Sequence, residues 1–143
     1  MAQMERQISI NAPTEKVYGY LADLTRHPEW AGDSLQVQQT SQGPVAAGTT
    51  FTSTAKMMGS HTAQIALTEL VPNSKIAFEA EDDSGRFRHY FVLQEEGAGT
   101  RLTKGVEMLK PSMMSRLLAP LLVGRITGAD LKRIKAKLES SAG

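Results

Sequence analysis

The sequence predicts an α+β protein in which a curved antiparallel sheet packs against one long C-terminal helix. Two observations predict this class. Between residues 35 and 108, short segments alternate apolar and polar side chains and are separated by turn residues, as in antiparallel strands. From Pro111 to about Ser141, apolar residues instead recur every three or four positions, which predicts a helix. Strands followed by a helix that covers their apolar side are typical of the α+β class.

A strand and one or two short helices precede the main sheet. Residues 5–10 read as a short strand, and Pro13 then suits the first turn of a helix. The apolar residues that follow fall on one helical face: Val17, Tyr20, Leu21 and Leu24. The segment 23–32 is either a turn or a second short helix, and it contains His27 and Trp30.

About six further strands follow, each bounded by turn residues. The alternating segments are 35–39, 49–58, 61–71, 75–80, 87–93 and 102–108. Each segment has one apolar side, which in an antiparallel sheet must face the core. Because 143 residues is the size of one domain and no linker or repeat divides the chain, we expect a single domain over residues 1–143.

The C-terminal helix carries two groups of apolar residues. The first group contains Met113, Met114, Leu117, Leu118, Leu121 and Leu122, and the second contains Leu131, Ile134 and Leu138. On a helical wheel the second group lies roughly a quarter turn from the first. Pro120 predicts a kink or a restart of the helix. Gly124 and Gly128 share a face; they either leave room for the sheet or a ligand, or mark a loosely specified helix.

Composition excludes several classes of function. The net charge is +1, from 16 basic and 15 acidic residues, so nothing points to nucleic acid or a membrane as an obligate partner. The chain has no cysteine, and its N-terminus lacks the apolar core of a signal peptide. The apolar run 117–123 is shorter than the ~20 residues of a membrane span. We therefore expect a cytoplasmic protein, either a monomer or a homodimer.

Motifs that would hold a metal, a nucleotide or a nucleophile are missing from the sequence. It lacks a P-loop, a His-Glu-x-x-His pair and a Gly-x-Ser-x-Gly elbow, and its three histidines are far apart along the chain. We therefore expect no metal and no cofactor.

Strand parity nevertheless places two histidines on the apolar side. His61 shares a side with Ile65, and His89 shares a side with Phe91. A buried neutral imidazole can act as an acid or a base near neutral pH, which makes both histidines candidate catalytic residues. The alternative is that each lies at the rim of the sheet or in solvent, at the end of its strand.

For two other side chains, the sequence allows either a structural role or a contact with a ligand. Lys104 shares parity with Leu102 and Val106, so it either extends to an edge of the sheet or contacts an anionic ligand. Trp30 either fills the core or forms a platform for a ligand.

Four sets of residues, which together span nearly the whole chain, carry a family resemblance. They are residues 8–13 with 17–18, 21–23 and 28–30, residues 68–72 with 76–78, residues 90–93 with 99–103, and residues 130–135. In these sets the sequence resembles the START-like (SRPBCC, Bet v 1-like) superfamily, and more closely its bacterial polyketide cyclase/dehydrase and lipid transport family. The resemblance implies a helix-grip fold, in which a seven-stranded antiparallel sheet wraps around the last helix over an apolar cavity, with two short helices after the first strand. It transfers no catalytic motif, because these families share none.

Three functions stay open at this point. The first is binding or carrying a hydrophobic small molecule, such as a lipid, a polyketide or an isoprenoid-like compound, between the sheet and the last helix. The second is a polyketide cyclase/dehydrase-like enzyme that uses the shape of the cavity and a histidine. The third is a protein-interaction module that docks through the helix. The absence of a catalytic motif favours the first, with these ligand contacts: Trp30, Phe51, His61, Ile65, Phe78, His89, Phe91, Met114, Leu117, Leu121 and Gly128.

Overall fold

The computed structural model describes residues 4–30, 36–56, 60–83 and 85–140. The first elements are the strand β1 (Met4–Ile10), the helix α1 (Thr14–Ala22) and the 3-10 helix η1 (Leu24–Glu29). Six strands follow: β2 (Gln36–Gln39), β3 (Thr50–Lys56), β4 (Ser60–Val71), β5 (Lys75–Asp82), β6 (Gly85–Glu96) and β7 (Gly99–Pro111). The last element is the helix α2 (Met113–Ser140). The predicted order of elements is confirmed, including the second short helix.

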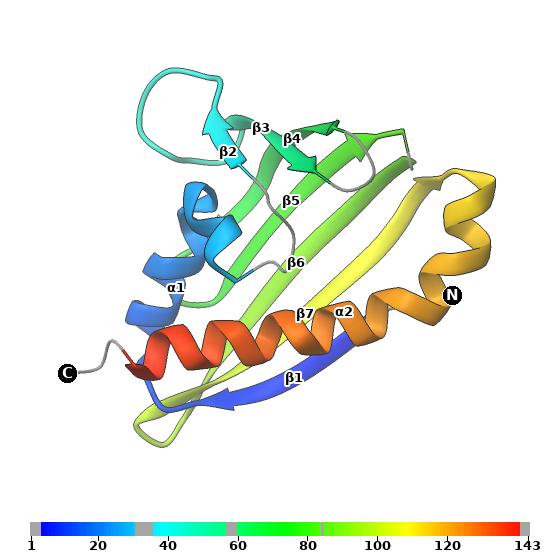
Figure 1. The fold of residues 1–143 in the computed structure, drawn as a ribbon. Coiled ribbons are helices and arrows are strands. Elements are labelled where there is room, and N and C mark those ends of the chain that lie inside the picture. Colours follow the sequence, from blue (N-terminus) through cyan, green and yellow to red (C-terminus); the bar gives the residue numbers. More distant parts are fainter. Residues whose placement is uncertain (1–3, 31–35, 57–59, 84, 141–143) are drawn as a thin grey trace.

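The seven strands form one antiparallel sheet in the order β1-β7-β6-β5-β4-β3-β2. The long helix α2 lies across β1 and β7, as Figure 1 shows, while α1 contacts β5, β6 and β7, and η1 contacts β2. The first strand pairs with the last one, so that Met4 lies opposite Val106. The helix-grip architecture that the resemblance implies is therefore confirmed.

Strand register sets two neighbouring rows of side chains on the inner face of the sheet. In one row Phe78 of β5 pairs with His89 of β6, which pairs with Val106 of β7. In the next row Phe91 of β6 pairs with Lys104 of β7. Because side chains alternate along a strand, His89 and Phe91 point to the same face. Polar and aromatic side chains thus lie next to one another in the middle of the sheet.

Tyr90, which lies between these two residues on β6, covers the opposite, outer face of the sheet. Its ring lies over Gly105 of β7, where a Cβ atom would come within 2.2 Å of the ring. The Tyr90 hydroxyl donates a hydrogen bond to Glu5 of β1 at 2.5 Å. Burial, and then the Glu5 carboxylate, raise the pKa of Tyr90. The glycine lets one tyrosine span three strands from the outside, which is consistent with His89 and Phe91 pointing inward.

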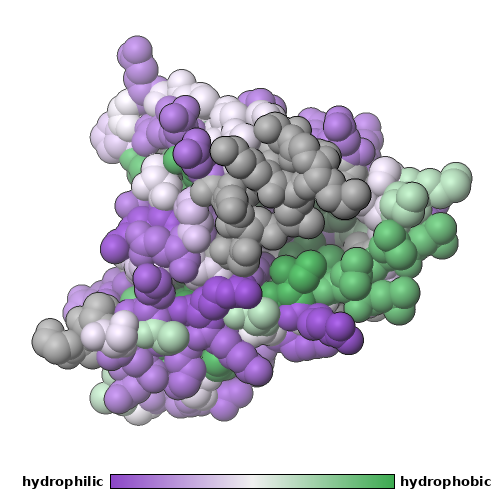
Figure 2. Space-filling view, viewed as in Figure 1, coloured by the Kyte–Doolittle hydropathy of each residue, from purple (hydrophilic) through white to green (hydrophobic). Residues whose placement is uncertain are grey.

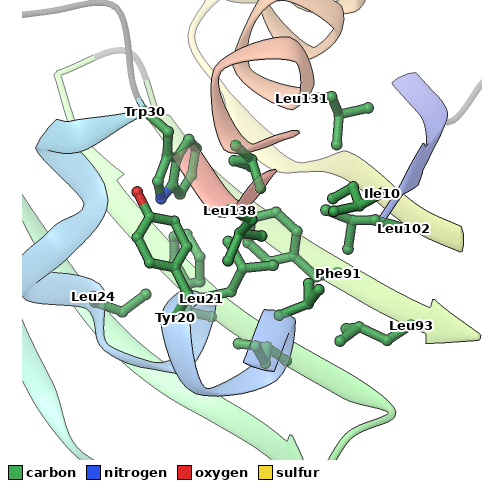
Figure 3. Close-up of a cluster of buried hydrophobic side chains, with 14 of the residues drawn as sticks. Ile10, Tyr20, Leu21, Leu24, Trp30, Phe91, Leu93, Leu102, Leu131 and Leu138 are labelled. Carbon is green, nitrogen blue, oxygen red and sulfur yellow. The ribbon is translucent and has the colours of Figure 1, made fainter. Parts of the chain in front are cut away.

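The core fills the space between the inner face and the helices, where side chains of η1, α1, β6 and α2 come together (Figure 3). Trp30, Phe78 and Phe91 are at most 2% exposed. The other large buried side chains are Leu21, Leu24, Phe51, Leu67, Ile76, Leu102, Leu131, Ile134 and Leu138. The predicted burial of Phe78 and Phe91 is confirmed.

The helix α2 buries its C-terminal half and exposes much of its N-terminal half. The Ser115 N–H donates to Ser112 Oγ at 3.1 Å, which caps the helix, and the helix continues through Pro120 without a restart. The second apolar group belongs to the core, whereas the first group is exposed. None of the described helices is both long and apolar enough to cross a membrane.

The expectation that Met114, Leu117 and Leu121 line the space between the sheet and α2 is wrong, and helix geometry explains why. At about 100° per residue, the mean direction of Met114, Leu117 and Leu121 differs by roughly a quarter of a turn from that of the second group. Because the helix does not restart at Pro120, a rotation that places the second group on the sheet turns the first group away from it.

Candidate functional site

Four titratable side chains come together on the inner face of the sheet, and each comes from a different element. They are His27 of η1, His89 of β6, Lys104 of β7 and Asp130 of α2. The aromatic rings of Trp30, Phe78 and Phe91 lie beside them. We call these four residues the inner polar cluster.

The aromatic rings hold both histidines in place. The His89 ring stacks on Phe78, with centroids 4.9 Å apart and planes 9° from parallel. The His27 ring lies 4.2 Å from Trp30 and 6.2 Å from Phe78. Trp30 in turn meets Phe91 edge-on at 5.7 Å. Such contacts fix the orientation of each imidazole without providing a hydrogen bond to it.

Lys104 is a buried cation, with only 4% of its surface exposed. Its Nζ atom lies 4.0 Å from the Asp130 carboxylate and about 6 Å from the ring centres of Trp30 and Phe91. Burial lowers the pKa of Lys104, and Asp130 opposes that shift. This position corrects the expectation that Lys104 extends to an edge of the sheet, because the side chain stays among the rings.

Asp130 connects the inner polar cluster to a second cation. Its carboxylate accepts a hydrogen bond from Arg133 at 3.1 Å, and Arg133 also donates to the Trp30 carbonyl at 3.3 Å. The helix α2 is thereby tied both to β7, through Lys104, and to the end of η1, through Trp30.

Both histidines of the cluster are uncharged at neutral pH. Burial lowers the pKa of His27 to about 3, and the positive charge of Lys104 contributes to that shift. Burial, then Lys104 and then His27, hold the pKa of His89 well below its usual value. A neutral imidazole carries one donor and one acceptor nitrogen, so both histidines can form hydrogen bonds inside the protein.

Two buried polar atoms have no hydrogen-bond partner within the described part of the chain: His89 Nδ1 and Thr127 Oγ1. Thr127 precedes Asp130 by three residues and Leu131 by four, so it lies on the buried face of α2. Buried polar atoms are usually paired, and an orphan requires an explanation. The arrangement provides two hydrogen-bonding atoms that a bound molecule can use.

Acid is expected to destabilise the protein through the two histidines of the cluster. The unfolded chain takes up protons on its imidazoles near pH 6.5, whereas folded His27 resists protonation down to about pH 3. Because the unfolded state then binds more protons, the stability that neutral His27 contributes is fully present above about pH 6.5 and falls as the pH drops, by on the order of 3 kcal/mol between about pH 6.5 and 4. Urea unfolding at several pH values across this window measures the loss.

The variant His27→Phe/His89→Phe is the matched control for this acid effect. It removes both imidazoles and leaves the carboxylates, so its stability should change less between about pH 6.5 and 4 than that of the parent. Equal pH dependence in parent and variant would mean that the fold does not hold the histidines in the neutral form.

Several of the residues predicted as ligand contacts lie in the core. Trp30, Phe51, Ile65, Phe78 and Phe91 all belong to one buried cluster. His89 lies beside them, stacked on Phe78. The backbone of His61 pairs with Ala55 in the sheet, but its side chain lies outside the part of the structure that is described.

The predicted contacts on α2 lie elsewhere. Met114, Leu117 and Leu121 are 66–72% exposed, which corrects the expectation that they form an inner wall. Gly128 lines, together with Leu121, a surface depression of about 540 Å³ beside Arg6. A Cβ atom built on Gly128 would meet nothing within 4 Å, so this glycine faces open space.

Sequence reasoning missed three members of the site: His27, Thr127 and Asp130. A signal existed for each of them. Asp130 precedes Ile134 by four residues, and His27 follows Leu24 by three, which places each on an apolar helical face. Thr127 shares the face of Leu131 in the same way. No group of residues that could hold a metal occurs among the described ones.

Comparison with known proteins agrees with this fold. The model of the polyketide cyclase/dehydrase and lipid transport family matches residues 1–139. The Zhui aromatase/cyclase from Streptomyces sp. R1128 superimposes with a TM-score of 0.79 at 16% identity, covering 99% of this chain and 96% of that one. Protein CV1439 from Chromobacterium violaceum gives a TM-score of 0.77 at 17% identity, covering 97% of this chain and 99% of that one.

A third similar structure is TTHA0849 from Thermus thermophilus, with a TM-score of 0.75 at 18% identity, covering 99% of this chain and 100% of that one. At such identities the three structures show a shared fold and nothing about activity. Among curated proteins, no sequence match is found. Because the family model spans almost the whole chain, the protein belongs to the polyketide cyclase/dehydrase and lipid transport family.

Proposed function

We propose that the protein binds a hydrophobic small molecule that carries a polar oxygen, and that His89 and Thr127 form hydrogen bonds with the polar part of this ligand. The observation that supports this most directly is the pair of buried polar atoms without a partner, His89 Nδ1 and Thr127 Oγ1. Leaving such an atom unpaired costs about 1–3 kcal/mol. A ligand that brings a hydroxyl or carbonyl oxygen offsets this cost, whereas a purely apolar ligand does not.

The surroundings of these atoms favour an apolar ligand body. The rings of Trp30, Phe78 and Phe91 lie next to the inner polar cluster, and small-molecule sites combine mostly apolar walls with a few polar groups. The description of the family names polyketide cyclisation and lipid transport, which supports a ligand of the polyketide or lipid class. A cavity between the sheet and α2, within a single domain, is part of this proposal.

Catalysis of the polyketide cyclase/dehydrase type is the second candidate function. It is supported by His89 and by the neighbouring cation Lys104. A general acid or base works best when its pKa lies near the working pH. Burial holds the pKa of His89 far below that range, so the imidazole is a weak base and is rarely protonated at neutral pH. Binding is therefore the first candidate.

A matched pair of probes tests the proposal: 2-naphthol, which carries one hydroxyl, and naphthalene, which carries none. Trp30 is the only tryptophan, so its indole N–H gives a single resonance in a nitrogen–proton NMR spectrum. We expect 2-naphthol to shift that resonance with a dissociation constant in the micromolar range. This corresponds to a binding free energy of about 8 kcal/mol. We expect naphthalene to bind about tenfold more weakly, the value of one hydrogen bond in a dry site.

The variant His89→Phe keeps a ring on Phe78 and removes the polar nitrogen. It should bind naphthalene at least as well as the parent and lose the preference for 2-naphthol. His61→Phe, measured in parallel, tests whether His61, which strand parity places on the apolar side of the sheet, also contacts the ligand. Saturable binding of neither probe would defeat the proposal, and an unchanged preference in His89→Phe would remove His89 from the site.

A further inference from the structure

The N-terminal half of α2 presents a continuous apolar surface, which we call the α2 apolar face. Its members are 42–81% exposed: Met113, Met114, Leu117, Leu118, Leu121, Leu122 and Ile126. Figure 2 shows a corresponding hydrophobic area at one side of the molecule, over the segment of α2 that is orange in Figure 1. Single exposed apolar side chains are common, but a contiguous group of this size marks an interaction surface.

Cations border the α2 apolar face. Arg6, Arg125 and Lys132 line the depression of about 540 Å³ that also contains Leu121, and no carboxylate lines it. Within the described residues, none of these three cations forms an ion pair. Between Glu107 and Asp130 the chain has no acidic residue, although it has Lys110, Arg116 and Arg125. The local charge is therefore positive in a chain whose net charge is only +1.

We propose that the α2 apolar face docks reversibly on the surface of an anionic lipid bilayer. Apolar helix side chains enter the boundary between headgroups and acyl chains, and nearby lysine and arginine side chains contact the phosphates. The depression beside Leu121 places three unpaired cations where a lipid phosphate would lie. This docking goes beyond the proposed ligand binding and does not depend on it.

The charge pattern distinguishes this partner from a second copy of the chain. A twofold contact uses the same surface on both copies. The cations Arg125 and Lys132, which lie beside Leu121, would then approach those of the other copy with no carboxylate between residues 108 and 129 to neutralise them. An anionic bilayer satisfies both the apolar and the cationic parts of the surface.

Co-sedimentation of the full chain with lipid vesicles tests the proposal. We expect binding to vesicles of phosphatidylcholine mixed with phosphatidylglycerol, and much weaker binding to vesicles of phosphatidylcholine alone. Because the charged part of the interaction is screened, binding should weaken as salt is raised.

Two variants separate the apolar part from the charged part. Leu117→Gln/Leu121→Gln should reduce binding to the anionic vesicles at least about tenfold, because both side chains enter the bilayer. Arg125→Gln should reduce it roughly fivefold. The matched controls are Val45→Gln/Val71→Gln, two exposed apolar residues away from α2, and Lys137→Gln, a cation in the last turns of α2. Neither control should change binding by more than about twofold.

Each result decides the proposal. Binding that requires the anionic lipid and is lost in the Leu117→Gln/Leu121→Gln variant supports it. No binding to either vesicle, or equal binding to both, would overturn it. A dimer in size-exclusion chromatography with light scattering that dissociates in the same variant would also overturn it, because a second copy would then cover the face. Circular dichroism should show an unchanged fold, since both leucines are exposed.

Discussion

Replacing Phe91 with alanine is expected to lower the free energy of unfolding by about 3–5 kcal/mol. Phe91 is 0% exposed, and its ring meets the edge of Trp30 on one side and the cation Lys104 on another. Because β6 lies inside the sheet and pairs with a strand on each side, its backbone cannot move inward to fill the space left behind. The cost therefore includes the cavity as well as the lost apolar contact. Phe78→Ala should fall in the same range.

Urea unfolding of parent and variant measures this loss, with Leu109→Ala as the control. Leu109 also lies on a strand of the sheet, but it is 43% exposed, so its truncation should change stability by about 0.5 kcal/mol or less. If Phe91→Ala loses less than about 1 kcal/mol, the ring does not fill the core as described.

The second large effect concerns the buried pair of Lys104 and Asp130. Asp130→Ala is expected to destabilise the protein by about 3–5 kcal/mol, because it leaves the ammonium buried without its carboxylate. Lys104→Met is expected to be neutral or stabilising by about 1–4 kcal/mol, since an apolar side chain of similar volume avoids the desolvation of a charge. Removing the carboxylate should therefore lower the free energy of unfolding, whereas replacing the lysine should leave it unchanged or raise it.

Lys75→Met is the matched control for the lysine substitution. Lys75 forms an ion pair with Glu69 at 3.2 Å on the surface, and such pairs contribute about 0–1 kcal/mol. Thermal and urea unfolding of the three variants give the comparison. A loss of several kcal/mol in Lys104→Met would show that the buried cation stabilises the fold, against the expectation from desolvation.

The alternation of apolar residues in the sequence predicts the sheet correctly, because a strand can bury only one side. That rule places His89, Phe91 and Lys104 on the inner face, where the structure has them. Which residues these side chains contact depends on how neighbouring strands are aligned with one another. The sequence of a single strand does not determine that alignment. Lys104 lies opposite Phe91, and its carboxylate partner Asp130 is 26 residues further along the chain.

Helix rotation explains the part of the site that the sequence does not predict. A period of three or four residues identifies apolar stripes on α2, but it does not say which stripe faces the sheet. The structure buries Leu131 and Ile134 and exposes Leu117 and Leu121, so the longer apolar run is the one outside. Thr127 then becomes part of the interior because it shares the buried stripe, although its own neighbours in sequence are glycine and isoleucine.

The pairing of β1 with β7 has a consequence for how the chain reaches this fold. Met4 pairs with Val106 and Ile10 with Thr100, so the first strand made during synthesis finds its partner only when most of the chain exists. Contacts between residues so distant in sequence slow folding, because the loop must close before any pairing stabilises it. Until then β1 has an unpaired edge, as does β6 on the side where β7 will pair. A nascent chain that ends before β7 therefore exposes two strands able to pair with other molecules.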